Sequence, residues 1–370
     1  MKIKNVNQKF SLVPMGIIFT FIFAGIVSCT GQKTDDAVFA AYELRINGHA
    51  DSAQILLQQI VNENPDNAQA WYELCRTTQQ LGMANPREIK EALDEALICI
   101  DKAVELDPES TLYLSYKGKI ETLHFYMGLQ MGDENAATYL DKFEKTYNSV
   151  FQMDPSYTED KLTLVEFFGG LPPDMGGDAD KAEKYAKELE AIDEIAGAKA
   201  RELLMPEDAD YVAFWEEIVK ENPENADALQ ALSRVCLFME NIDQATNYYQ
   251  KAIDLDSSKN ALYLDLGRYY MIGAMRDPSI LDSVAPMIDV QFKRFLNFTP
   301  EPIRPMKAWT YSTLSMINRR LENQEKAEKF LAKANELDPF RSFASAKPGK
   351  AIYCSPDEVV HEQRYYLSPF

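Results

Sequence analysis

Between residues 226 and 259, apolar and small side chains recur at the spacing of two short amphipathic helices. The first face carries Leu229, Leu232, Ser233 and Cys236, and the second carries Ala245, Tyr249 and Ala252. Small residues stand where two helices must approach closely, and larger apolar residues lie between them to fill a core. This stretch therefore predicts an antiparallel helix pair with a turn near residues 240–243.

The same arrangement of small and apolar positions recurs along most of the chain, and prolines separate the units. Residues 158–225 fit less well, because only their second helices are convincing. We predict seven to eight helix pairs and no sheet, since no long stretch alternates with period two. The positions that carry the pattern are Ala41, Ala53, Leu57, Ile60, Trp71, Leu74, Cys75, Ala96, Ile100, Ala103, Leu114, Gly118, Ala182, Ala186, Leu189, Trp215, Ile218, Tyr263, Leu266, Gly267, Tyr270, Ser315, Ala327, Leu331 and Ala334.

These units resemble the tetratricopeptide repeat, whose 34-residue pattern is W-x2-L-G-x2-Y…A-x3-F…P. The resemblance implies an all-α, right-handed solenoid with irregular insertions over residues 37–341, and first helices that face a concave surface. Residues 342–370 fit no repeat. Tyr365, Tyr366, Leu367 and Phe370 could fold back as a cap on the last pair, which we favour over a free tail because solenoid ends expose apolar faces.

Residues 1–28 have the order of an export signal, with Lys2, Lys4 and Lys9 before an apolar run that ends at Val27. Ile-Val-Ser-Cys resembles the lipobox of bacterial lipoproteins, which implies that Cys29 is acylated and that residues 29–36 form a short tether. The alternatives are a secretory signal with an incidental cysteine, or a short anchor helix. By analogy with sorting rules, Thr30 after the cysteine favours the outer membrane, with the protein facing the periplasm.

Composition narrows the function further. The chain carries 38 Lys and Arg against 58 Asp and Glu, a net charge of −20, which argues against binding a nucleic acid backbone. Five cysteines without a CxxC motif favour free thiols, although the pairing of Cys354 stays open. Three widely separated histidines suggest no metal site, and we expect no cofactor and no enzymatic activity.

A cation follows the glycine slot in four units, namely Arg76, Lys119, Arg234 and Arg268. In tetratricopeptide repeats this position faces the concave surface, so a basic ladder with Tyr72 and Tyr269 beside it would attract an acidic peptide or carboxylate. The alternative is that these cations only pair with acids of adjacent helices and steady the stack. The glycine-rich stretch Gly169–Asp178 is interpreted as a long turn, with Asp180 opening the next helix.

Two functions are consistent with these features. The first is a membrane-anchored scaffold that binds an unidentified envelope protein or peptide in its concave groove. The second is a small-ligand-binding accessory lipoprotein of a transport system, similar to the repeat lipoproteins of tripartite transporters. The sequence leaves the identity of the partner and the oligomeric state open, because repeat arrays bind very different partners.

Overall fold

The structure of this chain is a computed structural model that describes residues 36–85, 88–133 and 136–340. The predicted signal segment 1–28, nearly all of the tether with Cys29, and the tail 342–370 lie outside the described residues. The predictions of lipidation, of tail capping and of the state of Cys354 are therefore not tested by it.

The described residues form helices and no strand. Residues 36–46 are helical, and short 3-10 turns join some of the later helices. The bounds are α2 (Ala50–Glu63), α3 (Ala68–Ala84), α4 (Ile89–Leu106), α5 (Thr111–Met131), α6 (Ala136–Met153), α7 (Thr158–Gly170), η1 (Pro173–Met175), α8 (Ala179–Glu190), α9 (Glu194–Leu204), α10 (Tyr211–Glu221), α11 (Ala226–Phe238), α12 (Ile242–Leu255), η2 (Ser257–Ala261), α13 (Leu262–Arg276), η3 (Pro278–Ile280), α14 (Leu281–Leu296), α15 (Arg304–Arg320) and α16 (Gln324–Leu337).

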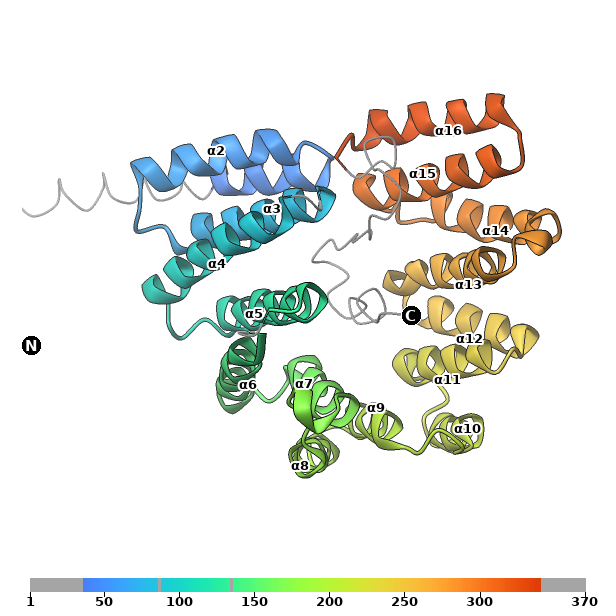
Figure 1. The fold of residues 1–370 in the computed structure, drawn as a ribbon, viewed down its shortest axis with the longest axis horizontal. Coiled ribbons are helices and arrows are strands. Elements are labelled where there is room, and N and C mark those ends of the chain that lie inside the picture. Colours follow the sequence, from blue (N-terminus) through green and yellow to red (C-terminus); the bar gives the residue numbers. More distant parts are fainter. Residues whose placement is uncertain (1–35, 86–87, 134–135, 341–370) are drawn as a thin grey trace, which may run out of the picture.

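The helices follow one another in antiparallel pairs, and the pairs curve into a ring (Figure 1). The helix of residues 36–46 pairs with α2, and the later pairs are α3 with α4, α5 with α6, α7 with α8, α11 with α12, α13 with α14, and α15 with α16. Between them, α9 packs mainly on α7 and α8, and α10 packs mainly on α11. With α9 and α10 counted as a loosely packed pair, the described helices make eight pairs, and the sequence predicted seven to eight. In Figure 1 α5, α7, α13 and α15 lie on the inner side of the ring, and α6, α8, α14 and α16 lie outside them.

Small residues occupy the points where paired helices approach most closely. A Cβ atom on Gly118 would lie 2.3 Å from the ring of Tyr147, and one on Gly267 would lie 2.2 Å from the ring of Phe292. Ala53, which holds an equivalent role in α2, is completely buried. Gly118 and Gly267 are therefore explained by packing, because a larger side chain at either position would collide with an aromatic ring of the partner helix.

The apolar core is divided into three clusters of buried residues that follow the chain around the ring. One runs from Val38 to Leu123, the next from Phe125 to Ala200, and the third from Ile195 to Ile317. Neighbouring clusters meet on a single helix, on α5 for the first two and on α9 for the last two. This arrangement is expected of a solenoid, in which each unit packs mainly on its neighbours.

The glycine-rich stretch is a turn, but the helix after it begins earlier than the sequence suggested. Asp178, not Asp180, caps α8, because its side chain accepts a hydrogen bond from the Lys181 amide. The Asp178 amide donates to the Phe168 carbonyl at 2.8 Å, which folds the turn back on α7. Gly177 is required there, since a Cβ would lie 1.7 Å from the carbonyl oxygen of Leu171.

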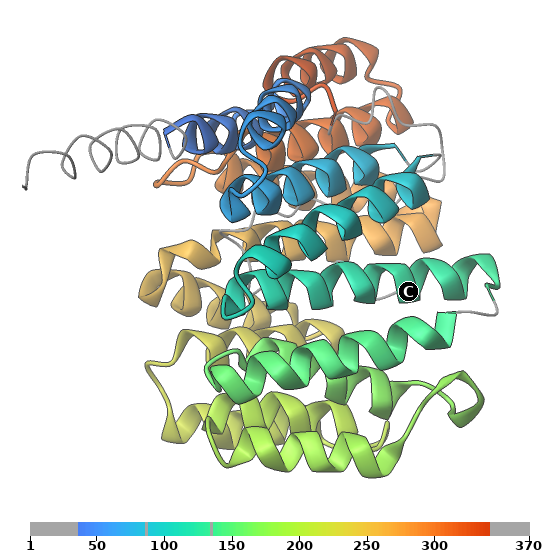
Figure 2. The same cartoon turned by 90° about the vertical axis from the view of Figure 1, so that its left-hand side faces the viewer.

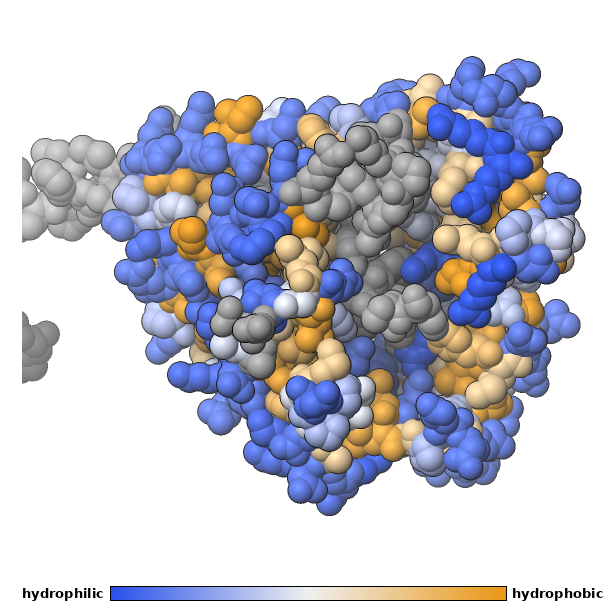
Figure 3. All heavy atoms as spheres, in the orientation of Figure 1, coloured by the Kyte–Doolittle hydropathy of each residue, from blue (hydrophilic) through white to orange (hydrophobic). Residues whose placement is uncertain are grey.

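The visible outer surface of the ring is mostly hydrophilic. On the face shown in Figure 3, hydrophilic side chains dominate the outer rim, and apolar side chains are exposed in separate places between them. Within the described ranges, no helix combines the length and the apolar character that crossing a membrane requires.

Candidate functional site on the inner side of the ring

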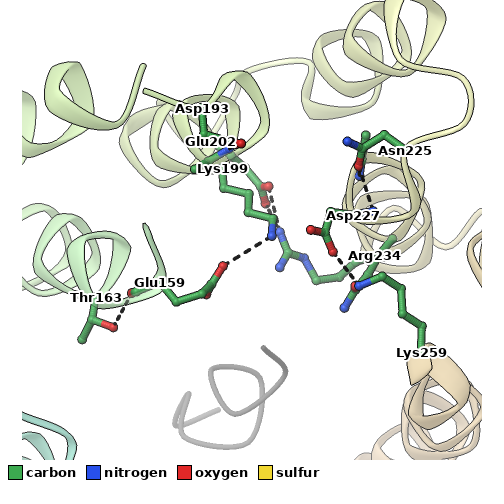
Figure 4. Close-up of polar contacts among 12 residues, drawn as sticks. Glu159, Thr163, Asp193, Lys199, Glu202, Asn225, Asp227, Arg234 and Lys259 are labelled. Atoms are coloured by element: carbon green, nitrogen blue, oxygen red, sulfur yellow. Dashed lines mark hydrogen bonds and ion pairs between the residues drawn. The ribbon is translucent and has the colours of Figure 1, made fainter. Parts of the chain in front are cut away.

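Charged side chains of α7, α9, α11 and η2 point toward one another on the inner side of the ring (Figure 4). Glu159 on α7 lies 3.5 Å from the Lys199 ammonium on α9. On α11 the Arg234 guanidinium donates to both carboxylate oxygens of Glu202, at 2.6 and 2.7 Å. Beside them, Lys259 of η2 lies 2.5 Å from Asp227. These groups alternate in sign, so the surface they form is polar and close to neutral.

The packing of α9, α10 and α11 fixes the orientation of this surface. Glu202 also accepts a hydrogen bond of 2.8 Å from the indole of Trp215, which is completely buried. The carboxylate is thereby held between a rigid aromatic side chain and Arg234. A preorganised pair of this kind presents its remaining hydrogen-bonding positions at little entropic cost to a partner.

The next repeat continues the polar surface through Asp265 and Arg268 on α13, whose charged groups are 3.6 Å apart. Burial raises the pKa of the Asp265 carboxyl to about 6, and the positive charges of Arg268 and Arg234 oppose this shift. Both arginines therefore act on the same carboxylate. The predicted neighbourhood of Arg234 and Arg268 exists in the structure, with Asp265 between them.

A second cluster lies across the ring, on the helix of residues 36–46 and on α3 (Figure 1). Arg45 and Arg76 converge on Glu73, at 3.3 and 2.5 Å. Arg45 also donates to Gln80 at 3.4 Å. The two guanidinium groups stand 5.4 and 5.8 Å from the ring centre of Tyr42.

Aromatic side chains connect Arg76 to Lys119. Arg76 lies 5.1 Å from the ring centre of Tyr72, and Tyr72 packs edge-on against Tyr116 at 5.3 Å. The Lys119 ammonium lies 4.9 Å from the ring centre of Tyr116. Arg76, Tyr72 and Tyr116 are buried, and contacts between a cation and an aromatic ring contribute about 2 kcal/mol when they are desolvated. The predicted pairing of Arg76 and Lys119 is thus mediated by tyrosines.

Tyr269, the other predicted aromatic residue, contacts the ring of Tyr270 at 5.6 Å. Burial raises the pKa of the Tyr269 hydroxyl, and the charge of Glu240 adds to the shift. Tyr269 is half-buried on α13, next to Arg268 in the chain. It therefore keeps some exposed surface beside the polar cluster.

Sequence reasoning identified four cations of these clusters but missed Arg45, Lys199 and Lys259, and it identified none of the acidic partners. Glu73 stands three residues before Arg76, and Asp265 stands three residues before Arg268. Residues three apart on a helix lie on the same face, so this spacing is a signal that the sequence already contained. Arg45 and Glu202 carried no comparable signal, because their contacts join helices of different repeats.

The described cysteine side chains are buried. Within the described ranges no cluster of three or more His, Cys, Asp or Glu could hold a metal ion. Cys75, Cys99 and Cys236 form no disulfide and are buried, and burial raises the pKa of the Cys99 thiol to about 12. A thiol of that pKa is not ionised near neutrality and is a poor nucleophile. The arrangement is suited to hydrogen bonding and ion pairing with a bound partner.

Two stretches, residues 226–259 and 310–341, match the tetratricopeptide repeat family. They coincide with the pairs α11 with α12 and α15 with α16. These two stretches, a minor part of the chain, are similar to tetratricopeptide repeats. The family resemblance that the sequence predicted is thus confirmed in the two units where its pattern was clearest.

Solved structures that are similar to this chain include a bacterial and a human protein. The thermophilic repeat protein TTC0263 of Thermus thermophilus is 21% identical and aligns over 64% of this chain and 96% of its own, with a TM-score of 0.37. The human IFIT1 dimer with PPP-AAAA is 14% identical and aligns over 80% of this chain and 76% of its own, with a TM-score of 0.38. No curated protein matches the sequence.

Proposed function

We propose that this repeat protein is a scaffold that binds a protein or peptide partner on the inner side of its ring, at the cell envelope. The observation that supports it best is the convergence of Glu159, Lys199, Glu202 and Arg234 from three successive repeats toward one region (Figure 4). Side chains from separate repeats that meet on one surface can recognise an extended partner at several points. A surface of both signs suits the mixed polar and charged groups of a polypeptide.

These charged residues contribute only a small part of the stability of the helix stack. Helix pairs are held by the three apolar clusters, whereas partly exposed ion pairs contribute about 0.2–1 kcal/mol each. Arg234 and Glu202 retain 18% and 15% of their side-chain exposure, so water and a partner can reach them. A role in recognition accounts for charged residues at these inward positions better than packing alone.

The membrane part of the proposal rests on the sequence. Residues 1–28 have the order of an export signal, and Cys29 follows the small residue Ser28. Acyl chains on Cys29 would give lasting attachment, since each buried CH₂ contributes about 0.8 kcal/mol. The first helix of the ring is under way by residue 36, so a lipid on Cys29 would hold the ring close to the membrane. The outer membrane, with the ring in the periplasm, is the location we propose.

Photo-crosslinking in cells tests the binding surface. A benzophenone amino acid replaces Tyr269, which keeps an aromatic ring at that position, and the control replaces Tyr248 on the second helix α12 of the preceding pair. We expect a discrete protein adduct at Tyr269 and none at Tyr248. The adduct should disappear with Arg268→Glu and persist with Arg319→Glu, a charge reversal at the exposed end of α15. An adduct of equal yield at both tyrosines, or none at either, contradicts the proposal.

Metabolic labelling with an alkyne fatty acid tests the anchor separately. We expect labelled protein in the membrane fraction, loss of the label with Cys29→Ala, and full labelling with Cys354→Ala. Retention of the label in Cys29→Ala, or an unlabelled wild type, would show that the anchor assignment is wrong. Neither result affects the crosslinking test.

A further inference from the structure

The two ends of the solenoid meet. In two views at right angles, α2 lies beside the last pair, α15 and α16 (Figures 1 and 2). The contact is made by the turn before α2, where a Cβ atom on Gly48 would lie 2.0 Å from the carbonyl oxygen of Leu337 and 3.2 Å from the Cα of Asp338. Both Gly48 and Asp338 are buried. We call this contact, between Gly48 and residues 337–338, the seam.

The seam differs from every other junction of the ring in how the core is arranged. Elsewhere, adjoining apolar clusters share a helix, so the chain and the core are continuous. At the seam, the buried residues of the first cluster begin with Val38 and those of the third end with Ile317, and the two clusters have no helix in common. The backbones touch at Gly48, a residue without a side chain.

We propose that the ring opens and closes at the seam while its helix pairs stay folded. In a repeat array, stability is the sum of units and of interfaces between neighbours, so losing one interface between the two ends leaves every other interface intact. Small rotations distributed over the pairs then separate the ends. Opening gives lateral access to the inner side of the ring. This inference does not depend on the identity of any partner.

Hydrogen exchange of the full chain, read by mass spectrometry, tests this proposal with a matched pair of glycine variants. Gly48 has a φ of +86° and ends the helix of residues 36–46, where the His49 amide donates to the Leu44 carbonyl. Gly132 has a φ of +69° and ends α5 in the same way, where the Asp133 amide donates to the Gly128 carbonyl. A Cβ on Gly132 meets no atom within 4 Å. Alanine therefore introduces similar backbone strain at both positions. Only in Gly48→Ala does the added Cβ collide with the other end of the chain at the seam.

In the wild type, we expect residues 44–50 and 331–340 to exchange faster than the centres of α11 and α14. In Gly48→Ala, both segments should exchange about tenfold faster or more, although they lie at opposite ends of the chain. Gly132→Ala should accelerate exchange only near its own turn. The proposal is overturned if Gly48→Ala affects residues 44–50 alone, or if it accelerates exchange uniformly around the ring. It is also overturned if the seam of the wild type is protected as strongly as α11 and α14.

Discussion

The ammonium group of Lys161 lies 2.8 Å from a carboxylate oxygen of Glu188, and its side chain is only 2% exposed. A second hydrogen bond of 2.7 Å reaches the Asn148 side chain. This contact joins α6, α7 and α8, in the region where the repeat pattern of the sequence is weakest. A buried cation held by hydrogen bonds thus links these pairs beside their apolar core.

We expect the two partners of this pair to respond differently to substitution. Glu188→Gln leaves the Lys161 charge buried without its carboxylate, and should lower the free energy of unfolding by about 1–3 kcal/mol. Lys161→Met removes the charge and leaves Glu188, which is 33% exposed, in contact with water, so its cost should be within about 1 kcal/mol. Urea denaturation measures both. Lys184→Met is the control, because Lys184 is 65% exposed and lies 3.9 Å from the same carboxylate. A larger loss for Lys161→Met than for Glu188→Gln contradicts the argument.

The sequence could predict the helix pairs because small residues at fixed spacing reflect contacts inside one pair. Ala182, Ala186 and Leu189 correctly identified α8, and all three are completely buried. The closure of the ring could not be predicted in this way. It depends on small rotations that accumulate over eight pairs, and it brings Gly48 against Leu337 with no local pattern to mark the contact.

The difference between contacts inside one pair and contacts between repeats also explains which residues of the candidate site the sequence could predict. Arg76, Lys119, Arg234 and Arg268 share one position in the repeat, so the sequence could identify them together. The partner of Arg234 is Glu202, from a repeat whose first helix matches the pattern poorly. Contacts between repeats depend on how helices stack, and a single sequence carries little information about that stacking.

The glycine slot of α13 gives a direct test of the packing. A Cβ on Gly267 would lie 2.2 Å from the ring of Phe292, which is completely buried and cannot move away freely. Gly267→Ala should therefore lower the free energy of unfolding by about 1–3 kcal/mol, despite the higher helix propensity of alanine. Gly170→Ala is the control, since a Cβ there meets no atom within 4 Å. Equal stability of the two variants in urea denaturation would falsify the packing argument.

Glu121 should make stability depend on pH in the acidic range. Its carboxylate is buried on α5 and accepts a hydrogen bond of 2.8 Å from the Thr146 hydroxyl. Burial raises the pKa of Glu121 above its ordinary value of 4.5, and this hydrogen bond opposes the shift in part. Between the two pKa values the folded state binds more protons than the unfolded state. The free energy of unfolding therefore falls as pH rises through this window.

Glu121→Gln removes the free-energy cost of burying an ionised carboxylate and keeps an acceptor for the Thr146 hydroxyl. We expect the variant to be about 1 kcal/mol more stable than the wild type at pH 8, with the difference vanishing near pH 4. Urea denaturation between pH 4 and 8 measures the difference, and Glu109→Gln, at an exposed position, is the control. A constant difference across this range would mean that Glu121 does not titrate differently in the folded state.

His124 should produce a pH dependence of the opposite sign. Its imidazole stacks on Tyr139 with ring centres 4.7 Å apart, and its Nε2 lies 3.8 Å from an Asp94 oxygen. Burial lowers the pKa of His124 below 6.5, and the positive charges of Lys90 and Lys142 lower it further. A hydrogen bond with the Leu93 backbone and the charge of Asp94 oppose this shift.

Because the folded pKa of His124 is below the unfolded one, the folded state binds fewer protons between them. The free energy of unfolding then falls as pH decreases from about 6.5 through the folded pKa. His124→Phe keeps an aromatic ring on Tyr139 and removes the titrating group, so its stability relative to the wild type should increase on going from pH 8 to pH 5. His49→Phe, at an exposed position, is the control. If the wild type and His124→Phe lose stability in parallel over this range, the buried imidazole is not the group that titrates.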